Sequence, residues 1–215
     1  PIYEFGKDWT IKKISKKYYV EIQDRLVSLD SKALKGNYQL ENSALALATL
    51  HYLNMLNTEL SEGCLAATVW PGRFQSLRNG VLHDIASKAN RENKIILDGA
   101  HNPSGAEAIA KEIKINKWEN TYLILALQKN KDLMGFINHF KGLVKKVFIL
   151  ESVEKNFLSL AQVRTKLINL DFEFYSSRTV ECAVKSITEV KPSGPRTIII
   201  TGSLYLVGKV LDSNN

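Results

Sequence analysis

The rhythm of hydrophobic and polar positions changes about a third of the way along the chain. From Ile2 to about Leu29, apolar residues alternate with lysines and other polar residues, which is typical of exposed antiparallel strands. From Leu40 to Leu60, apolar residues instead recur at spacings of three and four, which predicts one long helix with an apolar face. The residues expected on that face are Leu45, Ala48, Tyr52 and Leu56. The following segment, Glu62 to Arg73, contains glycines and a proline and is interpreted as a connector.

Beyond the connector, short apolar runs alternate with helical stretches. The runs expected to form strands are Lys94–Leu97, Tyr122–Leu127, Lys146–Leu150, Phe172–Tyr175 and Thr197–Thr201. The expected helices are Ala106–Ile115, Asp132–Leu143, Leu158–Ile168, Val180–Val190 and a final one after Gly202-Ser203. This alternation predicts an α/β fold, with a mostly parallel, Rossmann-like sheet and helices on both faces.

Composition narrows the class of protein. The 215 residues are 45% hydrophobic and 24% charged, which is globular usage and excludes disordered and collagen-like chains. The two cysteines, Cys64 and Cys182, lie far apart, which argues against a disulfide framework or a zinc site. The chain opens without a signal-peptide pattern and has no apolar run of about 20 residues, so we expect a cytoplasmic protein with no membrane partner.

The charge suggests an anionic partner. Lysine and arginine exceed aspartate and glutamate by 29 to 22, which gives a net charge of +7. Nucleic acid, a membrane surface and a small polyanion such as a nucleotide all fit this excess, and so does a basic surface that is merely solvated. The lysines occur in scattered pairs with few aromatic residues between them and without a recognised motif, so no nucleic-acid partner is expected.

Polar residues follow two of the expected strands. Asp98 and His101 come after Lys94–Leu97, and Ser203 follows Thr197–Thr201. In open α/β sheets, ligands bind beyond the carboxyl ends of the strands, so Asp98 and His101 could face one cleft and bind an amine, orient a phosphate or exchange a proton. The alternative from the pattern alone is structural, with Asp98 capping the next helix and His101 serving in a turn.

Two further residues stand out, each with a plain alternative. Arg73 lies in Trp70-Pro-Gly-Arg-Phe74, where an arginine beside a tight turn could clamp a phosphate or carboxylate, although an arginine in a loop is usually solvated. Asn42 lies near a helix start, where asparagine is commonly a cap. The sequence contains neither GxxxxGK[ST] nor GxGxxG, and no cluster with metal-ligand spacing, so the candidate site includes no metal ligands.

Taken together and in order, these motifs are specific. The chain contains GNYQLENSALALA from Gly36, then WPGRF from Trp70, LDGAHNP from Leu97, Lys131-Asp132, and TGSLYLVG from Thr201. This combination resembles the C-terminal half of the folylpolyglutamate synthase/dihydrofolate synthase family, a branch of the Mur ligase superfamily. The resemblance implies that residues 1–65 are the C-terminal part of the central ATP-binding ligase domain and that residues 66–215 are the C-terminal Rossmann-like ligase domain.

The resemblance also implies an ATP-dependent amide ligase. In that family, MgATP phosphorylates the carboxylate of folate or dihydropteroate, and the amine of L-glutamate then attacks the acyl phosphate. Matched position by position, Asn42, Arg73 and Asp98 bind ATP, with Arg73 reaching the phosphates, whereas His101 and Ser203 hold glutamate. Arg73 and His101 are the expected catalytic residues. Lys131-Asp132 is as well explained by a solvated loop as by a role in the site.

The departure from the family pattern concerns the phosphate loop. The family's GTNGKGS-type loop and its magnesium ligands belong to a part that this sequence does not contain. We therefore expect the chain to be inactive alone. It is then either a fragment of a ligase or the product of a split or shortened gene, and in a split gene a separately encoded N-terminal ligase half is the expected partner. The alternative is a non-catalytic nucleotide- or glutamate-binding module left by gene truncation. The sequence does not distinguish dihydrofolate synthase from folylpolyglutamate synthase activity.

Overall fold

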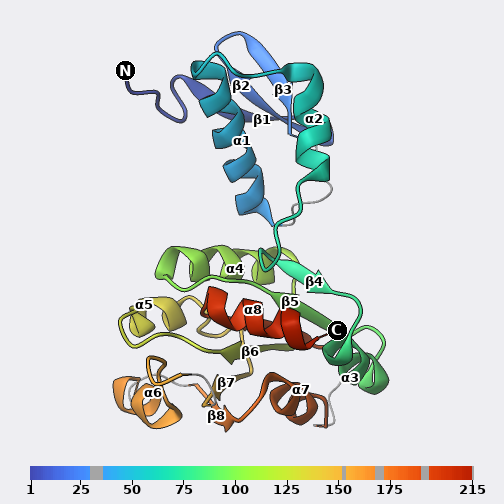
Figure 1. Ribbon diagram of the computed structural model, residues 1–215, viewed down its shortest axis with the longest axis vertical. Helices are drawn as coiled ribbons and strands as arrows, with labels where there is room; N and C mark the ends of the chain where they lie inside the picture. Colours follow the sequence, from blue (N-terminus) through green and yellow to red (C-terminus); the bar gives the residue numbers. More distant parts are fainter. Residues whose placement is uncertain (30–35, 152–153, 168–171, 190–193, 215) are drawn as a thin grey trace. The chain divides into compact units, whose positions relative to one another are not determined.

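The computed structural model describes residues 1–29, 36–151, 154–167, 172–189 and 194–214. Within it the chain divides into two compact units, Pro1–Pro71 and Gly72–Asn215 (Figure 1). The sequence suggests a boundary between residues 65 and 66, whereas the contacts divide later, between Pro71 and Gly72. The motif Trp70-Pro-Gly-Arg-Phe74 therefore spans the junction, with Arg73 in the second unit.

The first unit is a small antiparallel sheet with two helices. Strands β1 (Trp9–Ile14), β2 (Lys17–Ile22) and β3 (Arg25–Ser28) pair in sequential order, which confirms the predicted antiparallel strands. Helices α1 (Asn37–Tyr52) and α2 (Thr58–Ala67) follow. Their shared core comprises Trp9, Val20, Ile22, Val27, Leu29, Ala44, Leu47 and Ala48.

The prediction of one helix from Leu40 to Leu60 is wrong. Helix α1 ends at Tyr52, and Asn54 adopts a left-handed conformation with φ of 57°. Asn57 then begins α2, because its side-chain oxygen accepts the backbone N–H groups of Glu59 and Leu60 at 3.0 and 3.1 Å. Asparagine is suited both to a left-handed backbone and to a helix cap. The apolar spacing continues across this break, so the spacing alone does not reveal where α1 ends. Helix α2 also occupies half of the expected connector.

The predicted apolar face of α1 is partly wrong as well. Leu45 is 53% exposed, whereas Ala44, Leu47 and Ala48 are buried. The helix has apolar residues on more than one side, and its contacts with β1 and β2 determine which side is covered.

The second unit is built on a six-stranded sheet. Its strands are β4 (Gln75–Leu77), β5 (Lys94–Leu97), β6 (Thr121–Leu125), β7 (Lys146–Leu150), β8 (Phe174–Ser177) and β9 (Thr197–Thr201). Their spatial order is β4-β5-β9-β6-β7-β8, and every pairing is parallel except that of β4 with β5. The predicted mostly parallel sheet is thus confirmed.

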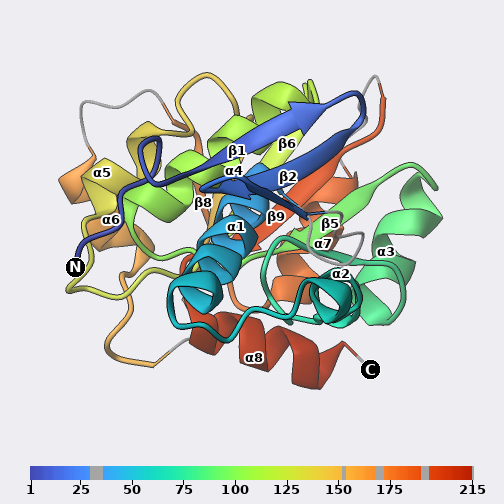
Figure 2. The ribbon, with the colours of Figure 1, turned by 90° about the horizontal axis from the view of Figure 1, so that it is seen from above.

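Helices cover both faces of this sheet. They are α3 (Val81–Ala89), α4 (Pro103–Ile115), α5 (Leu133–Asn138), α6 (Leu160–Lys166), α7 (Val180–Glu189) and α8 (Leu204–Ser213). Apolar side chains of α3, α7 and α8 share one core with alternate residues of the strands. Helix α4 lies across the sheet from α8 (Figure 2) and packs against α5, which in turn contacts α6. No helix within the described ranges is long and apolar enough to cross a bilayer.

Some elements of this unit escape the sequence pattern. Strand β4 and helix α3 were not predicted, and the expected strand Phe172–Tyr175 forms two residues later. The predicted helix ends at Ile168 and Val190 lie outside the described residues. Strand β4 is only three residues long and α3 follows a glycine turn, so neither presents a long periodic signal.

The register of β4 explains why distant motifs meet. Because β4 runs antiparallel to β5 with Gln75 opposite Leu97, the residues before β4 lie at the carboxyl end of β5. The parallel neighbour β9 ends at the same edge, since Leu97 pairs with Ile200. The three loops that carry the sequence motifs of the second unit are thereby gathered at one edge of the sheet.

Candidate functional site

Asp98 joins two of these loops. The residue is only 3% exposed, and its carboxylate accepts two backbone N–H groups, from Phe74 at 2.7 Å and from Ala100 at 2.8 Å. Its own N–H donates to the carbonyl of Ile200 in β9 at 3.0 Å. A buried carboxylate that receives backbone donors offsets its own desolvation, so Asp98 fixes the loop before β4 against the loop after β5.

The turn before β4 is fixed by contacts of the residues that precede and follow Arg73. Gly72 has φ of 68°, and its N–H donates to the side chain of Gln75 at 2.8 Å. The carbonyl of Gly72 accepts the N–H of Gly99 at 2.8 Å. A β-carbon on Gly72 would overlap the side chain of Val207, so this approach requires glycine.

Phe74 anchors the other side of Arg73. It adopts a left-handed backbone with φ of 47°, which is uncommon for an aromatic residue. Its ring is 5% exposed and stacks on Trp118, with centroids 6.1 Å apart and planes 7° from parallel. Arg73 itself is half-buried, and its backbone is fixed by both neighbours. An arginine on so constrained a backbone can present its planar donors in a defined direction.

The imidazole of His101 has a defined tautomer. Its Nδ1 lies 2.9 Å from the carbonyl oxygen of Gly99. A carbonyl only accepts hydrogen bonds, so Nδ1 carries the proton and Nε2 is the acceptor in the neutral ring. The side chain is half-buried, in contrast to the enclosed carboxylate of Asp98. The carboxylate of Asp98 accepts backbone amides, and His101 is the partly exposed residue of the two. That both side chains face one ligand cleft stays a prediction.

The end of β9 completes this edge. Gly202 N–H and the Thr201 hydroxyl both donate to the carbonyl of Ala100, at 2.9 and 3.2 Å. Ser203 caps α8, because its hydroxyl oxygen accepts the N–H groups of Tyr205 and Leu206 at 3.0 and 3.3 Å. Ser203 is 5% exposed, so its cap stabilises the helix start beside the loop after β5.

The structure thus brings together the segments that carry Arg73, Asp98, His101 and Ser203. Asn42 belongs to the first unit, where it is exposed within α1 and donates to the side chain of Gln39 at 3.3 Å. Asn42 is not a helix cap, since α1 begins at Asn37.

The capping residues of the second unit differ from those that the sequence suggested. Asn102, and not Asp98, caps α4 by accepting the N–H of Gly105 at 2.8 Å. Asp132 caps α5 through the N–H of Gly135 at 2.8 Å, which favours the structural interpretation of Lys131-Asp132. Within the described residues, no three His, Cys, Asp or Glu side chains gather where they could hold a metal ion. The side chains of this edge therefore do not fit a magnesium centre.

Sequence reasoning missed the groups that hold the loops together. The backbone N–H of Phe74 is a principal partner of Asp98, and a backbone amide leaves no mark in a residue pattern. The sequence pattern places Gly202 only ahead of the final helix, yet its φ is 109° and an added β-carbon would lie 2.6 Å from the carbonyl oxygen of Ala126. The glycines in both motifs were the available signal, since glycine after a strand often marks a close backbone approach.

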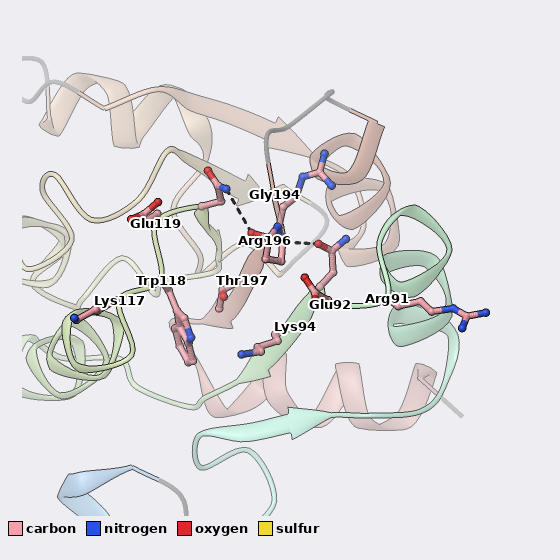
Figure 3. Close-up of a pocket in the computed structure, with 12 residues that line it drawn as sticks. Arg91, Glu92, Lys94, Lys117, Trp118, Glu119, Gly194, Arg196 and Thr197 are labelled. Carbon is pink, nitrogen blue, oxygen red and sulfur yellow. Dashed lines mark hydrogen bonds between the residues drawn. The ribbon is translucent and has the colours of Figure 1, made fainter.

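A sizeable cavity lies away from this edge. Its volume is about 580 Å³, and it opens where β5, β6 and β9 begin (Figure 3). Its lining residues come from 91–94, 117–120 and 194–197, and none of them is a predicted site residue.

Comparison with known families identifies the second unit. Residues 82–213, more than half of the chain, match the family model described as dihydrofolate synthetase, C-terminal domain. The chain belongs to this family. The resemblance to folylpolyglutamate and dihydrofolate synthases is thereby confirmed for the C-terminal portion.

Individual relatives agree with that assignment. The chain is 27% identical over 205 residues to dihydrofolate synthetase of Saccharomyces cerevisiae, covering 85% of this chain and 45% of that protein. It is 23% identical over 211 residues to dihydrofolate synthase/folylpolyglutamate synthase of Bacillus subtilis, covering 92% of this chain and 42% of the relative. The chain thus spans less than half the length of these curated relatives.

Solved structures share the fold. The Mycobacterium tuberculosis folylpolyglutamate synthase complexed with ADP and AMPPCP superimposes with a TM-score of 0.78 at 17% identity, covering 98% of this chain and 49% of that one. The bifunctional folylpolyglutamate synthase/dihydrofolate synthase of Yersinia pestis CO92 gives a TM-score of 0.77 at 21% identity, covering 99% and 47%. Both units therefore have the architecture of this ligase fold.

Proposed function

We propose that this chain supplies the C-terminal half of an ATP-dependent ligase that joins L-glutamate to the carboxylate of folate or dihydropteroate. The observation that carries the proposal is the convergence of three motif loops at the carboxyl edge of β5 and β9, joined by the buried carboxylate of Asp98. Family membership of the second unit supports the same reaction class. A cytoplasmic location stays a prediction.

The chemistry requires activation of a carboxylate. A carboxylate oxygen attacks the γ-phosphorus of ATP, ADP leaves, and an acyl phosphate forms. The amine of glutamate then attacks the acyl carbon, inorganic phosphate leaves, and the nitrogen loses a proton. Negative charge builds on phosphate oxygens in both steps, so rigidly held cationic donors stabilise them.

We assign to Arg73 the role of stabilising the negative charge on the phosphate oxygens. Its guanidinium has five N–H donors in a planar fork that matches phosphate oxygens. Gly72 and Phe74 hold its backbone through bonds to Gln75, Gly99 and Asp98. In this assignment Asp98 serves the ATP site by positioning Arg73, and Asn42 contacts the base.

His101 and Ser203 are assigned to the incoming glutamate. With Nδ1 committed to the carbonyl of Gly99, the neutral ring presents Nε2 as an acceptor for an amine N–H. The oxygen of Ser203 is engaged in capping α8, which leaves its hydroxyl hydrogen to donate to a carboxylate.

The proposal includes inactivity of the chain alone. The sequence contains no phosphate loop, and no side-chain cluster within the described residues fits Mg²⁺. One arginine cannot replace a cradle of backbone N–H groups, a lysine and a divalent ion around a triphosphate. Those groups would have to come from a segment outside these 215 residues.

A ligase assay tests this proposal. The chain is incubated with MgATP, L-glutamate and dihydropteroate or folate, and both ADP release and the amide product are measured. We expect neither to exceed the background without protein. Robust turnover by the chain alone would contradict the half-ligase account.

A non-catalytic binding module remains the second candidate, favoured by the same lack of a phosphate loop. Such a module would bind ATP or glutamate but would take no part in ligation, whichever segment were added to it. A phosphate-loop segment encoded in the same reading frame or in a neighbouring one would favour the ligase, and its absence from both would favour the binding module.

A further inference from the structure

The cavity at the amino ends of the strands is lined by segments that are joined to one another by hydrogen bonds of their backbone groups. Lys94 N–H donates to the carbonyl of Arg196 at 2.8 Å, and Arg196 N–H donates to the side-chain oxygen of Asn93 at 2.8 Å. Thr197 N–H donates to the carbonyl of Asn120 at 2.9 Å. Segments that are 77 to 103 residues apart in sequence are thus tied together, so the cavity is part of the folded framework.

Two side chains face each other inside it. Lys94 extends toward Trp118 in Figure 3, and its Nζ lies 5.8 Å from the centroid of the indole ring. Trp118 is half-buried and is stacked on the buried ring of Phe74, which holds the indole in place. The result is a fixed aromatic surface with an exposed ammonium group beside it.

The charges around the rim favour an anion. Arg91 and Lys117 extend away from the centre toward opposite sides (Figure 3). With exposed Lys94 and with Arg196, which is only 2% exposed and so lies behind the rim, they give four cationic side chains among the lining residues, against two carboxylates, Glu92 and Glu119. A positive excess raises the local concentration of anions, and a volume of about 580 Å³ accommodates a ligand the size of a nucleoside monophosphate.

We propose that this cavity is a binding site for a small anion with a planar aromatic ring, at the opposite edge of the sheet from the candidate ligase site. The ring lies against Trp118, and the anionic group pairs with the ammonium of Lys94. Ligands of open α/β sheets ordinarily occupy the carboxyl edge, so the fold does not by itself predict this site. It is independent of the proposed ligase reaction.

The test follows the indole N–H signal of Trp118 by NMR in the full chain. The chain has three tryptophans, and a Trp118→Phe variant assigns the signal. The probes are AMP and 2-naphthoate, which combine a ring with a phosphate or a carboxylate, and adenosine and inorganic phosphate, which each have one feature only. We expect at least one of the combined probes to shift the signal saturably. Adenosine should bind at least about tenfold more weakly because it lacks the charged hydrogen bond. Inorganic phosphate should also bind more weakly because it lacks the ring that contacts Trp118.

A matched pair of charge variants locates the anion. Lys94→Gln is expected to weaken the binding probe about tenfold. Lys185→Gln removes the same charge from an exposed position on α7 and is expected to leave binding unchanged. A saturable response with AMP alone indicates a phosphate ligand, and one with naphthoate alone indicates a carboxylate. The proposal is overturned if neither combined probe shifts the Trp118 signal at millimolar concentration, or if both lysine variants weaken binding equally.

Discussion

At the scale of single residues, the account depends on Asp98. Its carboxylate receives the N–H groups of Phe74 and Ala100, which belong to segments on either side of β4, α3 and β5. Together with the bond from Gly99 N–H to the carbonyl of Gly72, this side chain fixes the turn that carries Arg73 against the loop that carries His101. A carboxylate is suited to this task because both of its oxygens accept.

Replacing Asp98 by asparagine tests that role. The amide has one accepting oxygen, and its NH₂ group would face the second backbone donor, so one buried N–H is left without an acceptor. We expect a loss of about 1–3 kcal/mol in the free energy of unfolding, measured by urea denaturation. Asp212→Asn, an exposed change on α8, is the control and should leave the midpoint unaltered. Equal stability of both variants would show that Asp98 does not hold the loops.

Gly202 makes a second prediction at this scale. An alanine there would have to keep φ at 109° and place its β-carbon 2.6 Å from the carbonyl oxygen of Ala126. We expect Gly202→Ala to lower the free energy of unfolding by more than about 2 kcal/mol, because backbone strain and overlap add. Gly208→Ala, within α8 and with open space around it, should instead stabilise by about 0.5–1 kcal/mol. A stable Gly202→Ala variant would refute the close packing of β9 against β6.

At the scale of elements, helix α8 begins at the candidate site. Ser203→Ala removes the acceptor for the N–H groups of Tyr205 and Leu206. We expect a cost of about 1 kcal/mol in unfolding free energy. Asn102→Ala is the matched control, since it removes the cap of α4 without touching α8. If Ser203→Ala weakens glutamate binding and Asn102→Ala does not, the serine has a role beyond capping; equal effects would assign both residues to capping alone.

Lys146 on β7, Tyr175 on β8 and Glu173 just before β8 form a hydrogen-bonded cluster, and the charges of this cluster make a pH-dependent contribution to stability. Hydrogen bonds from the Tyr175 hydroxyl and from Lys146 lower the pKa of Glu173 below its usual 4.5. The pKa of Lys146 is raised above 10.5 by its bonds to Tyr175 and Glu173. The stabilisation from Glu173 is therefore present above the usual pKa of a glutamate and is lost as the pH falls through the pKa that Glu173 has in the folded protein. The stabilisation from Lys146 is lost as the pH rises through the pKa that Lys146 has in the folded protein.

Glu173→Gln should consequently reduce the melting temperature slightly at neutral pH and leave it unchanged in acid. The effect is small because Glu173 and Tyr175 are solvent-exposed and Lys146 is only half-buried. Melting curves across the acid range check it, with Glu119→Gln as an exposed control. An equal loss for Glu173→Gln at neutral and acid pH would contradict the assigned pKa direction.

Sequence patterns predicted the elements that have a long, regular signal. Lys146–Leu150 and Thr197–Thr201 match the observed strands at both ends, because continuous apolar runs are typical of buried parallel strands. The break between α1 and α2 was hidden, since asparagine supplies both a left-handed residue and a cap without interrupting the apolar spacing. At the site, the sequence indicated Arg73, Asp98, His101 and Ser203 as a set. It did not reveal that the partners of Asp98 are backbone amides, because those contacts arise from the antiparallel register of β4.

At the scale of the whole molecule, the two units have separate cores. The first comprises residues of the β1–β3 sheet and of α1, and the cluster that contains α3, α7 and α8 lies wholly within the second. The second unit, Gly72–Asn215, is large enough to bury an adequate core by itself. We expect the excised fragment 72–215 to unfold in one cooperative transition with the thermal midpoint that this unit has in the full chain. Calorimetry of both proteins tests this, and a fragment without a transition would show that the second unit depends on the first.

The most direct test of the central claim is a calorimetric titration of the chain with L-glutamate and with ATP. The central claim is that the loops after β5 and β9, together with Arg73, form part of a ligand pocket. We expect His101→Ala to weaken glutamate binding and Arg73→Ala to weaken ATP binding, each by about tenfold or more. His83→Ala, which changes a half-buried histidine of α3, should bind both ligands as the unaltered chain does. Failure of the unaltered chain to bind either ligand, or unchanged affinities for both ligands in both site variants, would contradict the account.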